Sequence, residues 1–96
     1  MTLPTLKVLN ALAAARGKEL SGADIARMTH IASGTLYPVL IRLEEAGWLA
    51  SRWERIEPRE VGRPRRRLYN ITGVGAANTK AAMKEIVAPA GVPAWA

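Results

Sequence analysis

The sequence predicts a mainly α-helical fold that contains a small β-hairpin, and three observations lead to this prediction. Apolar residues recur at helical spacing in three segments before residue 47. The pattern then changes to a period of two over two short segments, as in paired strands, and a further helical segment follows residue 72. A chain of 96 residues has the size of one domain.

The first predicted helix covers about residues 5–16. Thr2 can cap its start. Pro4 is tolerated in the first turn because the backbone N–H groups of that turn make no hydrogen bond within the helix. Gly17 is a typical residue just beyond a helix end. The apolar positions follow helical spacing and predict an inner face made by Leu6, Val8, Leu9, Leu12 and Ala13.

The second predicted helix is short. Ser21 and Asp24 have the spacing of a capping box, in which each side chain accepts a backbone hydrogen bond from the other residue. We expect Ile25 and Met28 to face inward and the helix to end near Thr29.

The third predicted helix covers residues 33–46 and is the most informative segment. Ser33 is a good cap, and an apolar stripe at helical spacing predicts one buried face, made by Leu36, Val39, Leu40 and Leu43. The other face is free for contacts. Pro38 lies one turn inside this helix, where it removes a backbone donor and stiffens the first turn.

A hairpin follows. Residues 49–54 and 66–71 alternate as strands do, and residues 57–65 hold two prolines and a glycine, as a loop does. We expect Trp48 and Trp53 to pack the hairpin on the helices. The alternative is that one of them lines an effector pocket at a dimer interface.

The last predicted helix covers about residues 73–87 and is capped by Thr72. Its apolar side is expected to contain Val74, Ala77, Ala81 or Ala82, Met83 and Ile86. Because one such helix has little core left to cover, it is suited to pairing with a second copy of the chain. The residues after it have the composition of an irregular tail.

The net charge of +6 is concentrated in one segment. Between residues 52 and 67 there are seven arginines and three glutamates. A basic excess in a small domain favours a polyanionic partner, and arginine suits planar contacts to phosphates and base edges. A charge run alone is equally compatible with a solvated surface.

No residue set in the sequence predicts catalysis, a metal or a cofactor. There is no cysteine, and the single histidine, His30, lacks the companions of a zinc site. Glu44 and Glu45 are adjacent, so they diverge on a helix and cannot act as an acid–base pair. Because no nucleophile, base and oxyanion site come together, we expect no enzyme activity.

The chain also lacks the apolar run of ~20 residues that a membrane-spanning helix requires. Its N-terminus does not have the charged start and apolar block of a signal peptide. We therefore expect no membrane association and a cytoplasmic protein. The basic segment, with its expected polyanionic partner, adds the expectation that the protein is nucleoid-associated.

Three helices followed by a hairpin with a basic tip occur in the order of a winged helix-turn-helix. We expect residues 1–72 to form this domain, 73–88 a C-terminal dimerisation helix and 89–96 an irregular tail. The third helix would then present its free face to the major groove, and the hairpin loop 54–66, here called the wing, would reach the backbone or the minor groove. The candidate DNA contacts are Ser33, Gly34, Thr35, Tyr37, Pro38, Arg42, Arg63, Arg65 and Arg66. For Arg42, a pair with Glu45 or Glu44 is the alternative.

The segments "GTLYPVLIRLEEAGWL", "SRWE" and "GRPRRRLYNIT-G" occur in this order and resemble the PadR family of bacterial transcriptional regulators. The resemblance covers roughly residues 33–73. It implies a winged-helix DNA-binding repressor that is usually dimeric and often responds to small molecules. It assigns Tyr37 and the start of its helix to DNA contact, the wing arginines to the backbone, and the C-terminal helix to dimerisation.

The resulting hypothesis is a sequence-specific regulator of transcription that binds double-stranded DNA as a homodimer. An architectural DNA binder without strong sequence preference is one alternative, because a basic wing serves it equally well. A winged-helix module that binds proteins is the other, and the arginine-rich wing argues against it.

Overall fold

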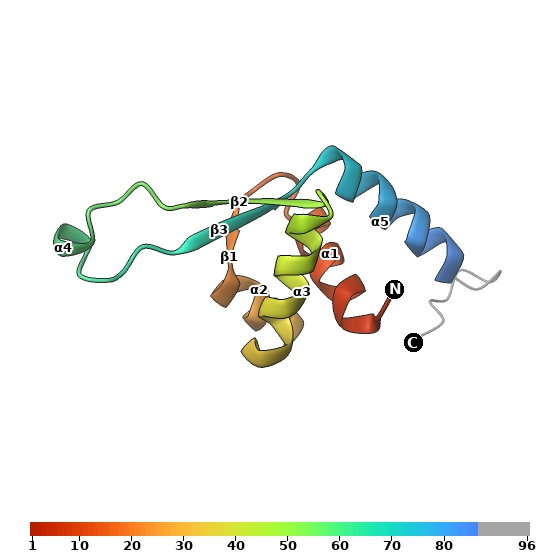
Figure 1. The fold of residues 1–96 in the computed structure, drawn as a ribbon, viewed down its shortest axis with the longest axis horizontal. Coiled ribbons are helices and arrows are strands. Elements are labelled where there is room, and N and C mark those ends of the chain that lie inside the picture. The colour runs from red at the N-terminus through yellow and green to blue at the C-terminus, as the bar shows by residue number, and fades with distance from the viewer. Residues whose placement is uncertain (87–96) are drawn as a thin grey trace.

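A computed structural model of the chain describes residues 1–86 and confirms the predicted fold class. Three helices form the body, a small sheet extends from it, and a last helix crosses its other side (Figure 1). The elements in chain order are α1 Leu3–Ala14, β1 Leu20–Ser21, α2 Gly22–Thr29, α3 Ser33–Glu45, β2 Leu49–Trp53, α4 Pro58–Val61, β3 Arg67–Ile71 and α5 Gly73–Ile86. The expected end of the last helix beyond Ile86 and the expected tail 89–96 lie outside the described residues.

The core lies where α1, α2 and α3 meet under the sheet. It contains the predicted apolar stripe of α3 and three residues of the face predicted for α1, together with one residue from each of α2, β2 and β3. Of the other two residues predicted for α1, Leu6 is buried and Ala13 is partly buried. Its buried members are Val8, Leu9, Leu12, Ile25, Leu36, Val39, Leu40, Leu43, Leu49 and Tyr69. This packing fixes the orientation of α3, because one of its faces is fully committed to the core.

Helix α1 begins and ends two residues earlier than the predicted range of 5–16. Thr2 is its N-cap, and its hydroxyl accepts a hydrogen bond from the Thr5 N–H at 3.3 Å. At the other end, Arg16 and Gly17 both have positive φ angles, 52° and 84°, which a helix cannot contain. The left-handed turn therefore starts before the glycine that marks it in the sequence.

The predicted capping box of α2 is confirmed. The Asp24 N–H donates to the Ser21 hydroxyl, and the Ser21 N–H donates to an Asp24 carboxylate oxygen, both at 3.1 Å. The backbone hydrogen bond from Ser21 is the main cause that lowers the pKa of Asp24. The prediction for Met28 was wrong: its side chain is 50% exposed. Thr29 is buried instead, and its hydroxyl is satisfied because it donates to the Ile25 carbonyl at 2.7 Å.

The sheet has three antiparallel strands in the order β1–β3–β2. The predicted hairpin is confirmed as β2 and β3, with Ser51 opposite Tyr69. The sequence did not predict β1, which pairs Leu20 with Tyr69 and Ser21 with Leu68. A two-residue strand contains no periodicity, so no pattern announces it.

The wing extends away from the helical body, and the short helix α4 lies at its far end (Figure 1). The prediction of a loop throughout residues 57–65 was therefore wrong for α4. Pro58 begins this helix, the Glu57 side chain caps it by accepting from the Arg59 N–H at 3.4 Å, and Gly62 ends it at φ 79°.

Helix α5 begins at the predicted cap, where the Thr72 hydroxyl accepts from the Gly75 N–H at 3.0 Å. A side chain at Gly75 would place its Cβ 2.1 Å from the Trp48 carbonyl oxygen, so glycine allows α5 to approach this closely. The helix packs on α1, where the Asn10 amide lies 3.5 Å from the Met83 sulfur. Val74, Ala77 and Ala81 are exposed, so this part of the predicted apolar side does not face the core of the chain.

Candidate nucleic-acid interface

The outer face of α3 contains all six of the helix residues that the sequence predicts as DNA contacts. Leu36, Val39, Leu40 and Leu43 are buried as predicted, which leaves the opposite face in solvent. The exposed residues on that face include Ser33, Gly34, Thr35, Tyr37, Pro38, Ile41 and Arg42. Among residues 1–86, the Arg42 side chain forms no ion pair, so the alternative pairing with Glu45 or Glu44 does not occur there.

The start of α3 differs from the prediction in one respect. Ala32 is the N-cap and Ser33 is the first helical residue, so no side chain caps the helix within the described part of the chain. A helix leaves its first backbone N–H groups without partners inside the helix, and its dipole makes this end positive. Because Ala32, Ser33 and Gly34 are all exposed, this end is open to an anion.

Pro38 neither ends nor shortens α3. The helix runs unbroken from Ser33 to Glu45 with the proline inside it. Pro38 has no N–H to donate to the carbonyl four residues earlier, which belongs to Gly34, and its ring crowds that carbonyl. Both residues lie on the exposed face, where water can satisfy the free carbonyl.

Tyr37 connects the outer face of α3 with the start of α2. Its side chain is 44% exposed, and its hydroxyl lies against Gly22, where an added Cβ would be only 2.6 Å away. The sequence predicted Tyr37 as a contact but gave no indication of this packing. Gly22 thus provides the space that allows the ring to lie across the two helices.

An ion pair holds the base of the wing together. The two terminal nitrogens of the Arg63 guanidinium, Nη1 and Nη2, donate to the Glu54 carboxylate at 2.6 and 3.2 Å. The same carboxylate accepts the Arg66 N–H at 2.9 Å, and the Glu54 N–H donates to the Arg66 carbonyl at 2.9 Å. The hydrogen bond from Arg63 is the largest cause that lowers the pKa of Glu54 to about 2. Arg63, predicted as a phosphate contact, is therefore engaged inside the wing.

The other two predicted wing arginines differ from each other. The Arg65 Nε donates to the Ile56 carbonyl across the wing at 3.0 Å. Arg66 is exposed, and its guanidinium has no protein partner among residues 1–86. Arg55 and Arg59 are also exposed in the wing, although the sequence reasoning did not select them. In the sequence, only the basic segment indicated these two arginines, and a basic segment does not show which arginines have partners within the chain.

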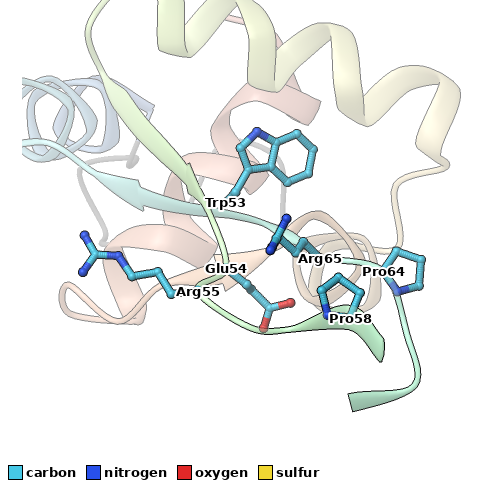
Figure 2. Close-up of a pocket in the computed structure, with 6 residues that line it drawn as sticks. All are labelled: Trp53, Glu54, Arg55, Pro58, Pro64 and Arg65. Atoms are coloured by element: carbon cyan, nitrogen blue, oxygen red, sulfur yellow. The ribbon is translucent and has the colours of Figure 1, made fainter. Parts of the chain in front are cut away.

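A hollow of about 890 Å³ lies at the side of the wing. Figure 2 shows Trp53, Pro58, Pro64 and Arg65 around it, with Arg55 extending away from them. Two proline rings and an indole give this side of the wing an apolar surface next to its guanidinium groups. The wing therefore presents both charge and flat apolar groups.

A second hollow of about 580 Å³, here called the α3–wing groove, separates α3 from the wing. It brings Tyr37 and Ile41 of α3 together with Arg65 and Arg66 of the wing. Its full lining is Ser21, Gly22, Ala23, Tyr37, Ile41, Glu44, Trp53, Arg65, Arg66, Arg67 and Tyr69. Residues from both predicted parts of the interface thus border one groove.

Arg67 lies in this groove and connects several of its groups. Its Nε donates to the Ser51 hydroxyl at 2.9 Å, and the Ser51 hydroxyl lies 2.6 and 2.8 Å from the two Glu44 oxygens. The Arg67 guanidinium also lies 5.1 Å from the centre of the Trp53 ring, a cation–π distance. Trp53 is 58% exposed, so the expectation that it packs on the helices was wrong, whereas Trp48 is partly buried against the core.

Residues 8–81 match the family model described as the transcriptional regulator PadR-like family. The matched range contains most of α1 and α5, all of α3, and the whole wing. The match therefore includes every residue of the candidate interface. Among curated proteins, no sequence matches the chain.

Solved structures of similar fold are winged-helix regulators. NadR in complex with 4-hydroxyphenylacetate superimposes with a TM-score of 0.72 at 22% identity, over 88% of this chain and 55% of NadR. For wild-type MarR from E. coli in its apo form, the values are 0.71, 21%, 88% and 56%. For smu.1704 from Streptococcus mutans UA159, they are 0.65, 28%, 84% and 76%. The chain spans little more than half the length of the first two proteins. None of the helices in residues 1–86 combines the length and apolar character needed to cross a membrane.

Proposed function

The chain belongs to the PadR-like family of transcriptional regulators, and we propose that it is a homodimeric repressor that recognises a specific sequence in double-stranded DNA. In this proposal α3 lies in the major groove and the wing contacts the backbone or the minor groove beside it. Repression follows from occupation of promoter DNA.

The α3–wing groove is the observation that supports this proposal most strongly. Tyr37 and Ile41 of α3 border the same hollow as Arg65 and Arg66 of the wing, so one DNA duplex can contact both elements. Direct reading of bases requires side chains on a helix that fits the major groove. On its exposed face, α3 offers Thr35, Tyr37 and Arg42 for this role. Phosphate contacts fix the register and contribute most of the affinity.

The proposed phosphate contacts are Arg65, Arg66 and the open start of α3. Arg66 is the strongest candidate because its guanidinium is exposed and has no protein partner among the described residues. Arg63 has a different proposed role. Because both of its terminal guanidinium nitrogens are bound by Glu54, we propose that Arg63 orders the part of the wing that contains Arg65 and Arg66.

The exposed apolar side of α5 supports the homodimer. Val74 is 59% exposed, and Ala77 and Ala81 lie exposed on the same helix. Pairing of these faces would cover apolar surface that the core of one chain leaves open. Two-fold symmetry would then place two copies of α3 about one DNA turn apart, ~34 Å, or multiples of it, over a roughly palindromic site. Sedimentation equilibrium of the intact chain gives the oligomeric state directly.

The proposal includes a small-molecule effector that binds between the two subunits. The PadR resemblance supports it, and NadR was solved with 4-hydroxyphenylacetate. A ligand at that position would change the spacing of the two α3 helices and so the affinity for DNA. Its expected signature is an operator affinity that depends on ligand concentration.

Fluorescence anisotropy at physiological salt tests the proposal. One labelled duplex contains the intergenic segment upstream of the gene for this chain, and the other is a shuffled sequence of equal length. We expect the first to bind at least ~10³-fold more tightly. Equal and strongly salt-dependent binding to both would favour an architectural DNA binder. Absence of binding to either would favour a module that binds proteins.

A further inference from the structure

Trp53 is the most exposed large aromatic side chain of the α3–wing groove. It is 58% exposed, although a tryptophan in a small domain usually contributes its large apolar area to the core. On the α3 side, the apolar residue Ile41 is 55% exposed and Tyr37 is 44% exposed. Three large side chains therefore line the groove with apolar surface that is not buried in the core of the chain.

The Trp53 ring is held in place by a network behind it. Arg67 stacks on the ring at 5.1 Å and is itself fixed by the Ser51 hydroxyl at 2.9 Å. The Ser51 hydroxyl in turn donates to the Glu44 carboxylate, and one oxygen of that carboxylate lies 3.8 Å from Nη2 of Arg67. An exposed side chain that is fixed before binding loses less conformational entropy when a partner covers it. The indole is thus a pre-organised surface.

The chemistry of the groove fits one strand of a DNA backbone. Deoxyribose rings present apolar C–H groups, and phosphates lie between them at regular intervals. The apolar residues Trp53 and Ile41 line the groove together with the cationic residues Arg65 and Arg66. Apolar surface next to cations complements a chain in which sugars alternate with anions.

We propose that the α3–wing groove binds the sugar–phosphate strand that runs between the major groove and the adjacent minor groove, with Trp53 and Ile41 on its deoxyribose rings. This inference rests on the proposed function, in which α3 and the wing enter those two grooves. It assigns to Trp53 a contact that carries no net charge and reads no base. Arg65 and Arg66 contact the phosphates on either side of the sugars.

Substitution of Trp53 tests this inference through two measurements made together, the affinity and its dependence on salt. Trp53→Ala should lower the affinity for the upstream duplex and for the shuffled duplex by the same factor, about tenfold. The slope of log K against log salt should stay unchanged, because no phosphate contact is lost. Arg66→Ala should reduce that slope by about one.

Met28→Ala is the matched control, because Met28 is 50% exposed and lines a different hollow, between α1 and α2. It should leave both affinities unchanged. A second measurement does not depend on the stability of the Trp53→Ala variant. DNA should change the tryptophan emission of the parent protein, and the milder variant Trp53→Phe should lose that change while it retains most of the affinity.

The outcomes separate this inference from the proposed function. If the parent protein binds neither duplex, the proposed function is wrong and this inference is overturned with it. If the parent binds DNA but Trp53→Ala binds within twofold of it, only this inference is overturned. A reduced salt slope in Trp53→Ala would also overturn it, because Trp53 would then act by supporting a phosphate contact and not by covering a deoxyribose.

Discussion

Helix α3 and the wing form the two sides of one groove, but different forces hold them in place. Four buried apolar side chains fix α3 on the core. Charged and polar groups fix the wing, chiefly the Glu54 carboxylate with Arg63 and the Arg66 N–H. Burial of apolar groups involves no charge that salt can screen or pH can titrate, whereas a partly exposed ion pair responds to both. The proposed base-reading side is therefore held by apolar packing, whereas the conformation of the proposed phosphate-binding side should depend on salt and pH.

The largest expected effect breaks the α3 side of this comparison. Leu40 is fully buried in the core, so Leu40→Ala should lower the free energy of unfolding by about 2–5 kcal/mol. The adjacent Ile41 is 55% exposed, and Ile41→Ala should change that free energy by no more than about 0.5 kcal/mol. Urea denaturation of the two variants provides the comparison. Equal losses would show that α3 is not anchored by the predicted stripe.

The next effect concerns the wing alone. Arg66→Ala removes an exposed guanidinium and should weaken binding of the upstream and shuffled duplexes alike, by about tenfold, with a salt slope lower by about one. Its thermal unfolding midpoint should stay close to that of the parent, because the exposed guanidinium forms no hydrogen bond or ion pair within residues 1–86. An unchanged salt slope would remove Arg66 from the proposed phosphate contacts.

The smallest effect sharpens the electrostatic side of the comparison. Arg63 is the main cause that lowers the pKa of Glu54 to about 2. The contacts of this carboxylate with the Arg63 guanidinium and the Arg66 N–H are here called the Glu54 clamp. The clamp should contribute its full stabilisation above the ordinary pKa of a glutamate, about 4.3. That contribution should disappear as the pH falls through about 2, where the folded wing protonates this carboxylate. An NMR titration of the Glu54 side-chain carboxyl carbon measures the midpoint directly.

Arg63→Ala is the control for this titration. Without the guanidinium, the midpoint should rise toward the value of an ordinary glutamate, because the main cause of the lowered pKa is gone. Exchange of the Arg66 N–H should also become faster in Glu54→Gln, since its acceptor at 2.9 Å loses its charge. A Glu54 midpoint that is identical with and without Arg63 would contradict the clamp.

Features that depend on neighbouring residues in the chain could be predicted from the sequence. The apolar stripe of α3, the capping box of Ser21 and Asp24, and the cap of Thr72 were all predicted and are confirmed. Each involves residues three or four positions apart, so the pattern itself contains the geometry. The hairpin was predicted for a related reason, since a period of two is visible along each strand.

Features that depend on contacts between distant residues could not be predicted. The ion pair of Glu54 and Arg63 spans the hairpin, and an arginine count does not reveal which guanidinium groups are already bound. Trp53 was expected to pack on the helices because its residue type is usually buried, but it is the last residue of β2, is 58% exposed and is not part of the core. Strand β1 depends on its partner β3, far along the chain. The sequence therefore predicted which side of α3 is exposed, whereas only the structure shows which wing arginines already have partners within the chain. The DNA contacts themselves stay a prediction.

The most direct test of the central claim compares the contributions of α3 and of the wing to sequence specificity. Thr35 and Arg42 are exposed on α3, and a double substitution of both with alanine is compared with Arg66→Ala in the wing. Anisotropy titrations give the ratio of affinities for the upstream and shuffled duplexes. We expect the α3 variant to lower this ratio by at least about tenfold and the wing variant to leave it unchanged. A ratio that is unchanged in the α3 variant, or that falls equally in both, would contradict base reading by α3.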